Sequence, residues 1–211
     1  LPTVAGWIGT AAGAFAAHTI TVDIPVGPRY PELWIECNPG AAKKLLGDLL
    51  GEVRLKVNGK VQRVATALEI NKLNVLNGVT YACIGGLTAA PQAALGIYLA
   101  EPWRESEEAQ DALAWSTGDV STFQVEIDIV AYGAAAAGLT KPIARAVIDN
   151  SLVGPNNVDA PLGAIVKWFN VQIPVASGWN DFTSFPKRDF YQSLHVFDAN
   201  LVEFEVKVDN N

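Results

Sequence analysis

The chain has 211 residues, which allows one or two domains with a sizeable core and excludes the small disulfide-stapled class. Half of the residues are hydrophobic and 18% are charged, so the composition excludes a disordered or coiled-coil protein. The net charge is −7 and no Lys/Arg run interleaves with aromatic residues, so we expect no direct binding to nucleic acid. The two cysteines, Cys37 and Cys83, are too few for a disulfide framework and are expected to be reduced, buried side chains.

Residues 1–17 carry no charge and consist mainly of small and apolar side chains. They differ from a signal peptide because no basic residue precedes them, and they are too short to span a bilayer comfortably. We interpret them as an N-terminal apolar arm that packs on a neighbouring subunit or on a lipid surface. Because the sequence contains no Met, we also expect that Leu1 is not the translated start.

Alternation of apolar and polar residues with a period of two predicts antiparallel strands in the region 18–132. The predicted strands are 19–26, 33–37, 52–57, 95–99 and 123–129. Their inward-facing side chains form the expected core, which consists of Ile20, Val22, Ile24, Leu33, Ile35, Val53, Leu55, Val57, Ile97, Leu99, Phe123, Val125, Ile127 and Ile129.

The segments between these strands are less regular. Asn58-Gly59 predicts a hairpin, with a three-residue loop or a bulge, because Val57 suits a position opposite Val61 better than one opposite Lys60. A short helix is predicted over 41–50, whereas 66–77 fits neither a helix nor a strand clearly. The acidic segment 105–111 is expected to be a solvated excursion.

Residues 133–164 lose the alternation and are interpreted as a linker, with a helix-compatible piece around 143–148. The strand patterns of the first unit then recur in the same order: 171–175 resembles 22–26, 194–197 resembles 33–36, and 204–209 resembles 53–58. Residues 165–211 therefore predict the first strands of a second, duplicated unit. This unit stops after three strands, so by analogy with the first we expect roughly 70 or more further residues.

No catalytic, cofactor-binding or metal-binding site is predicted, and we expect that the protein is not an enzyme. His18 and His195 have no partner at zinc-site spacing, and Ser116 lies outside a nucleophile elbow. The carboxylate pairs Glu126/Asp128 and Glu203/Glu205 each share one strand face, which suits the wet face of a sheet better than a glycosidase.

Loop residues with side-chain oxygens offer no calcium site either, since loop polarity explains them equally well. They are Asn156, Asn157, Asp159, Asp209, Asn210 and Asn211.

In this order, several of these segments resemble the double-jelly-roll major capsid proteins of tail-less, membrane-containing double-stranded DNA bacteriophages, of corticovirus or autolykivirus type. The segments that carry the resemblance are 24–27 with Tyr30 and Leu33, then 53–60, 70–72, 101–104, and 111–115 continuing through 123–128. The resemblance covers most of 18–132 and is weaker around 194–209.

The resemblance implies an all-β double jelly roll, whose second roll is incomplete in this chain, and a viral structural protein located in the capsid of the virion. It further implies a homotrimer that forms a pseudo-hexameric capsomer of an icosahedral shell, with neighbouring capsomers as partners. Penton or minor capsid proteins, and the internal viral membrane contacted through the arm, are further implied partners.

The alternative is a jelly-roll carbohydrate-binding module of the lectin type. In that reading Trp7, Trp103 and Trp179 are exposed stacking platforms for sugars. A lectin more often carries a calcium cluster and a secretion signal, neither of which is visible in the sequence. Assembly of the protein into particles would favour the capsid hypothesis, whereas binding to a glycan array would favour the lectin hypothesis.

Overall fold

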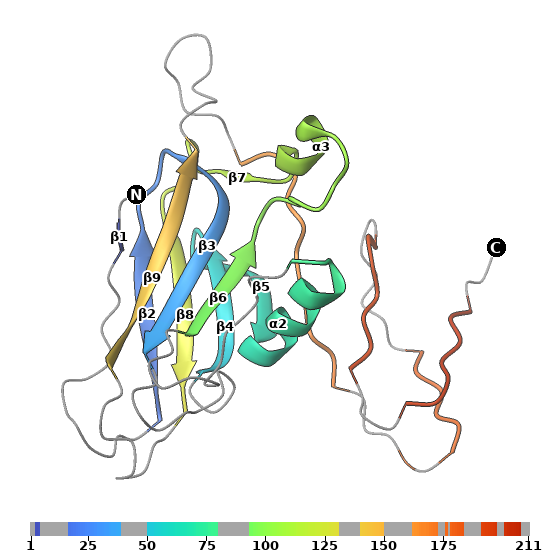
Figure 1. The fold of residues 1–211 in the computed structure, drawn as a ribbon. Coiled ribbons are helices and arrows are strands. Elements are labelled where there is room, and N and C mark those ends of the chain that lie inside the picture. The colour runs from blue at the N-terminus through green and yellow to red at the C-terminus, as the bar shows by residue number, and fades with distance from the viewer. Residues whose placement is uncertain are drawn as a thin grey trace. The chain divides into compact units, whose positions relative to one another are not determined.

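The computed structural model describes residues 3–4, 17–38, 50–79, 93–130, 140–149, 162–172, 176, 178–183, 191–197 and 201–207. The chain divides into two compact units, Leu1–Val171 and Gln172–Asn211. The strands and helices of the described residues all belong to the first unit (Figure 1). Residues 39–49, 80–92, 131–139 and 150–161 lie outside the described part, and with them Cys83, most of the predicted linker and all of the helix predicted at 41–50 except Leu50, which begins a strand.

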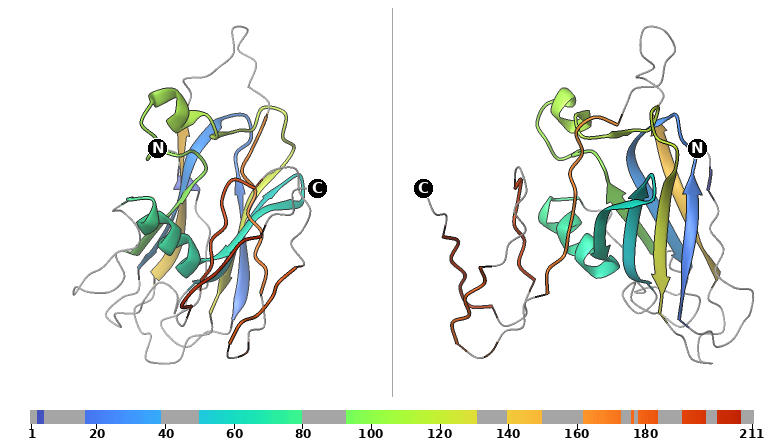
Figure 2. Two further views of the ribbon diagram at one scale, coloured as in Figure 1. Left: turned by 90° about the vertical axis from the view of Figure 1, so that its right-hand side faces the viewer. Right: turned by 180° about the vertical axis from the view of Figure 1, so that it is seen from behind.

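Antiparallel strands form two sheets that lie face to face (Figures 1 and 2). One sheet has the order β1-β9-β3-β6, with β7 also paired to β3. Its strands are β1 (Thr3–Val4), β9 (Thr140–Asp149), β3 (Arg29–Asn38), β6 (Ala93–Tyr98) and β7 (Trp115–Ser116). The other sheet has the order β2-β8-β4-β5. Its strands are β2 (His18–Ile24), β8 (Phe123–Ile129), β4 (Leu50–Val57) and β5 (Lys60–Thr66).

The chain crosses repeatedly between the two sheets. It runs from β2 to β3 in the opposite sheet, returns to β4 and its hairpin partner β5, and crosses again to β6. It then returns to β8 and ends in β9 on the other side. Repeated crossing between two antiparallel sheets is the arrangement of a jelly roll. The all-β, antiparallel expectation is therefore confirmed.

The core lies between the sheets and contains every inward-facing residue that alternation predicted; Ile20, at 8%, is the most exposed of them. Sequence patterning missed two aromatic members, Tyr30 and Trp115, which are fully buried. Both rings pack against Phe123, with centroids 5.6 Å apart in each pair. The Tyr30 hydroxyl donates to the carbonyl of Pro25, and burial raises the pKa of Tyr30 to about 12.

The hairpin between β4 and β5 differs from its expected register. Asn58 and Gly59 have positive φ angles, of 51° and 74°, as the central residues of a tight two-residue hairpin turn require. Val57 therefore lies opposite Lys60. The expected pairing with Val61 is wrong. The predicted bulge does occur, but within the ladder, where the register shifts between Leu55 and Lys56. The Asn-Gly pair sets the turn, and the bulge then restores the inward alternation of β5.

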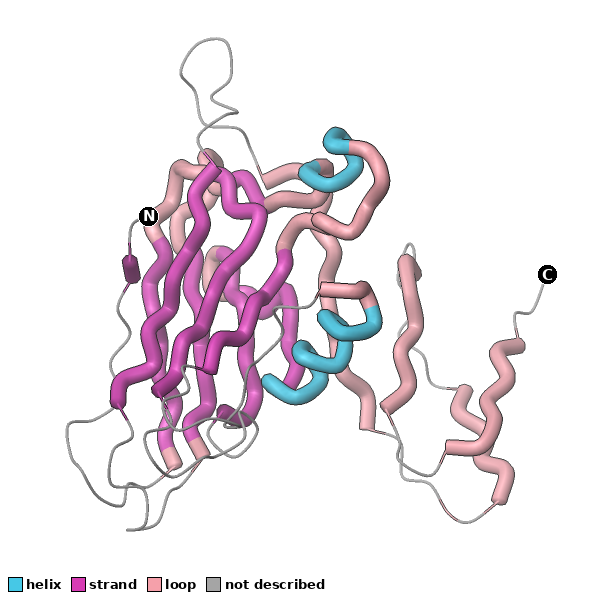
Figure 3. Tube along the Cα trace, in the orientation of Figure 1, coloured by secondary structure: helices cyan, strands magenta, loops and turns pink. Residues whose placement is uncertain are grey.

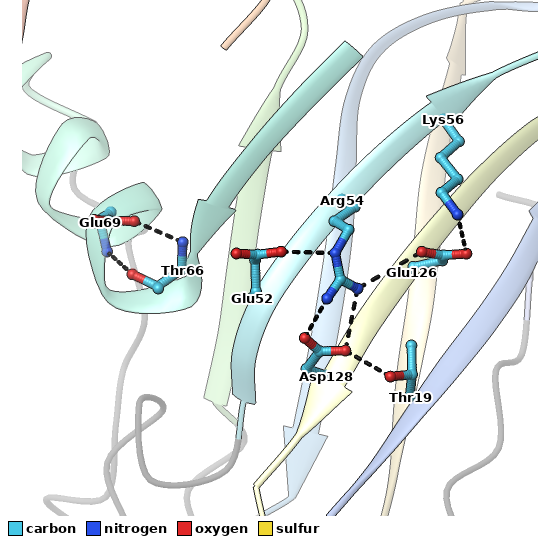
Figure 4. A network of polar contacts seen from close by, with 8 residues as sticks. All are labelled: Thr19, Glu52, Arg54, Lys56, Thr66, Glu69, Glu126 and Asp128. Atoms are coloured by element: carbon cyan, nitrogen blue, oxygen red, sulfur yellow. Dashed lines mark hydrogen bonds and ion pairs between the residues drawn. The ribbon is translucent and has the colours of Figure 1, made fainter. Parts of the chain in front are cut away.

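The segment 66–77, whose sequence pattern fitted neither a helix nor a strand clearly, contains the helix α2 (Ala67–Leu76). Thr66 caps it: its hydroxyl accepts from the Glu69 amide at 3.2 Å, and the Glu69 carboxylate accepts from the Thr66 amide at 2.7 Å (Figure 4). The helix buries only Ala67, Ile70 and Asn74, which explains why its apolar periodicity is weak. Its exposed apolar residues are Leu68, Val75 and Leu76.

The strand β9 corrects the linker expected at 133–164, including the helix-compatible piece around 143–148. It pairs with β3 from Asn38 to Arg29, so its backbone hydrogen bonds are satisfied by a partner distant in the sequence, which alternation within β9 does not reveal. The acidic excursion at 105–111 includes the short, exposed helix α3 (Glu107–Asp111), which Ser106 caps.

Of the predicted N-terminal arm, the structure describes Thr3, Val4 and Ala17, and the first two pair with β9 of the same chain. Where residues 168–207 are described, they contain no strand, and Figure 3 draws them as loop. The strands expected at 168–175, 194–197 and 204–209 are therefore not formed at those described positions, because a strand pattern also requires a partner strand for its backbone.

Truncating Phe123 should test the aromatic centre of the core. We expect Phe123→Ala to lower the free energy of unfolding by about 3–5 kcal/mol, because it removes a fully buried ring that two other rings contact. Val61→Ala, at a site 46% exposed, should change it by less than about 0.5 kcal/mol. Urea unfolding measures both, and similar values for the two variants would contradict the core assignment.

Candidate functional site

A network of charged side chains crosses the outer face of the β2-β8-β4-β5 sheet (Figure 4). Arg54 of β4 lies at its centre. Its Nη1 donates to Oδ1 of Asp128 at 3.1 Å, its Nη2 donates to the other oxygen of the same carboxylate, and its Nε donates to Glu52 at 2.7 Å. Glu126 is 3.6 Å from Arg54 and also accepts from Lys56. The strands β4 and β8 are thereby joined through side chains as well as through their backbone hydrogen bonds.

The register of the sheet brings these groups together. In β4 from Glu52 onward and throughout β8, the even-numbered residues point outward, since the odd-numbered residues from Val53 and from Phe123 onward are buried in the core. Arg54 is paired directly with Glu126, and Thr19 of β2 is paired with Asp128. The Thr19 hydroxyl donates to Asp128 at 2.7 Å. Cross-strand pairs of opposite charge stabilise such a sheet face.

The network determines the ionisation of Asp128. Partial burial by itself would raise the pKa of this carboxyl, but hydrogen bonds from Arg54 and Thr19, with the charge of Arg54, hold it below its usual value. The hydrogen bond to Asp128 is also the main cause that raises the pKa of Arg54. Asp128 is therefore an ionised acceptor paired with Arg54, and Glu126 lies beside Arg54 on the same outer face, which agrees with the prediction of a solvent-facing side of the sheet.

A second charged group, Arg63 of β5, points inward and is 3% exposed. Its guanidinium carbon lies 5.1 Å from the ring centroid of Trp115 and 4.5 Å from that of Trp168. Its Nε donates to the carbonyl of Val166 at 2.7 Å, and its Nη1 donates to that of Tyr98 at 2.6 Å. Burial lowers the pKa of Arg63 to about 9, which leaves it charged at neutral pH. Backbone carbonyls and aromatic faces thus replace water around a buried cation.

Of the residues considered for chemistry in the sequence, Ser116 and His18 lie in different sheets of the first unit. Ser116 is buried in β7, His18 begins β2, and His195 is exposed, with its Nε2 3.0 Å from the Ser193 hydroxyl. Glu203 and Glu205 are exposed. The calcium candidates lie outside the described residues. In the part of the chain that the structure describes, no three His, Cys, Asp or Glu side chains gather as a metal site would require.

Of the proposed sugar platforms, Trp179 is 76% exposed, whereas Trp103 is half-buried and packs its ring edge-to-face with Tyr98 at 6.1 Å. Trp7 lies outside the described residues. Among the described helices, none has the length and apolar character that a bilayer span requires.

Known proteins similar to this chain include a protein family and a solved structure. The model of the family described as viral coat protein P2 N-terminal domain matches residues 9–145. Among solved structures, the major capsid protein P2 from Bacteriophage PM2 is similar, with 16% sequence identity and a TM-score of 0.48. That match covers 70% of this chain and 50% of the phage protein, so this chain spans about half of its length. A search of curated proteins finds no significant match.

The Asp128 network predicts a specific acid dependence of stability. The pKa of Asp128 is lower in the folded state than in the unfolded state, where it is about 3.9. The ionised Asp128 carboxylate therefore stabilises the fold fully above the unfolded-state pKa, and this stabilisation is lost as the pH falls through the lower folded-state pKa. We expect Asp128→Asn to be less stable than the unchanged protein at pH 7, with a difference that shrinks toward pH 2. Urea unfolding across this range measures it, with the exposed Asp23→Asn as control. An unchanged difference at every pH would contradict the role of Asp128.

Proposed function

Because the chain belongs to the family of viral coat protein P2 N-terminal domains, with a match over residues 9–145, we propose that it is a major capsid subunit of an icosahedral virion. Its place is the capsid, and the coat role is structural. The observation that carries the proposal is the family match over the same residues that build the two-sheet jelly roll, β2 through the first half of β9.

The subunit assembles as a homotrimer, and its trimers form pseudo-hexameric capsomers that contact one another in the shell. Residues 172–211 form the second compact unit, and a second jelly roll in this part of the protein would let three chains supply six rolls. The recurrence of the strand patterns of 22–58 supports this duplication. The low proportion of charged residues, 18%, suits a subunit whose surface is largely covered by neighbours.

The remaining partners follow from composition. Apart from Thr3 and Val4, which pair with β9 of the same chain, the uncharged arm of residues 1–17 contacts a neighbouring subunit or the internal viral membrane, and penton or minor capsid proteins are further partners. The net charge of −7 argues against direct contact with the packaged nucleic acid. The subunit has no catalytic activity; the charged groups of the sheet face are engaged with one another, which supports a structural role.

Oligomeric state tests this proposal. Light scattering of the purified protein at micromolar concentration should give the mass of a trimer, because an obligate capsomer interface buries several thousand Å². The same material should bind no glycan on an array. A stable monomer would contradict the trimer, and specific sugar binding by a protein absent from particles would favour the lectin alternative.

A further inference from the structure

We propose that residues 162–170, here named the strap, are a segment that can detach from the jelly roll and reattach, and that the contacts of the Arg63 guanidinium with the Trp115 and Trp168 rings hold it in place. The strap lies beyond the family match, which ends at residue 145, and after the last strand of the jelly roll. Its opening and closing would set where the chain beyond residue 171 leaves the roll.

The strap is attached at several separated points. At its start, the Leu162 amide donates to Oδ1 of Asp119 at 2.8 Å. In its middle, the Trp168 amide donates to the carbonyl of Gln62 at 3.0 Å, next to the Arg63 side chain. At its end, the Asn170 side chain donates to the Glu69 carboxylate of α2 at 3.1 Å. Leu162, Ile165 and Trp168 also pack, partly buried, against the core.

These contacts fasten the strap without making it part of a sheet. Within the described residues, the strap has no strand or helix, and the Trp168–Gln62 bond is the one backbone–backbone hydrogen bond recorded for it. Its attachment therefore depends on side chains, above all on the stacked guanidinium, which also donates to the strap carbonyl of Val166. A segment held in this way can detach at a lower free energy than the two sheets require to unfold.

Arg63 is suited to this role because it contacts both the core and the strap. Trp115, which the guanidinium contacts, is fully buried and packs on Phe123. Trp168, which the same guanidinium contacts, belongs to the strap and is only half-buried. Removing the Trp168 ring therefore affects the strap and leaves the core aromatics in place.

The consequence for assembly rests on the proposed coat function, but the fastening itself does not. A closed strap holds Asn170 at the first turn of α2, so the following residues leave the roll from one fixed place. An open strap would let them start from a range of positions, as subunits with different neighbours in a shell require.

Hydrogen exchange of the purified chain, followed by mass spectrometry, tests the strap. In Trp168→Ala, we expect peptides that cover 162–171 to exchange at least about tenfold faster, while peptides from β8 exchange as before. Trp179→Ala is the control, since that ring is exposed, and it should change neither set. Arg63→Lys, which keeps the charge but loses the flat guanidinium group, should give an intermediate acceleration of the strap.

Two results would overturn the proposal. Unchanged strap exchange in Trp168→Ala would show that these contacts do not hold the strap in place. Equal acceleration of the strap and β8 would show that the strap unfolds only with the whole roll. Neither result bears on trimer formation, so a failure here is distinguishable from a failure of the proposed coat function.

Discussion

The first unit depends on the placement of β8 between β2 and β4. Every second side chain of β8, from Phe123 to Ile129, enters the core at 3% exposure or less. The side chains between them carry Glu126 and Asp128 into the charged network on the other face. A shift of one residue in this register would bury two carboxylates and expose four apolar side chains. Core packing and ion pairing therefore specify the same alignment.

A series of contacts between aromatic rings and the Arg63 guanidinium connects Phe123 of β8 to Trp168 of the strap, which follows the last strand of the jelly roll. Phe123 contacts Trp115, the Trp115 ring lies on the Arg63 guanidinium, and the same guanidinium stacks on Trp168. One buried cation thus joins the tightly packed core to a segment with no secondary structure. Its cost of desolvation is offset by the two carbonyl acceptors, from Tyr98 and Val166, and by the two rings.

Alternation predicted most inward residues of β2, β3, β4, β6 and β8, because these strands place alternate side chains in the core, but it missed Tyr30 of β3, Leu50 of β4 and Leu95 of β6. It also placed Glu126 and Asp128 on the wet face. It did not reveal their partners, since Arg54 and Asp128 come together only through the pairing of strands that are 74 residues apart in sequence.

The elements that sequence analysis missed depend on contacts that are distant in the sequence or on local signals that were not used. Thr66 and Glu69 have the spacing of a capping box and could have identified α2. Arg63 has no such signal, because a charged residue on an alternating strand is normally assigned to solvent; only the convergence of Trp115 and Trp168 makes its burial favourable. The strand β9 was interpreted as linker because its partner β3 is more than a hundred residues away.

The central claim is that this jelly roll is the repeating unit of a viral coat. Cryo-electron microscopy of native particles, at a resolution that traces side chains, tests it most directly. The account predicts that the shell density contains this chain, with β8 between β2 and β4 and the Arg63 side chain in contact with two indole rings. A shell built from another protein, or from this chain with a different strand order, would contradict it.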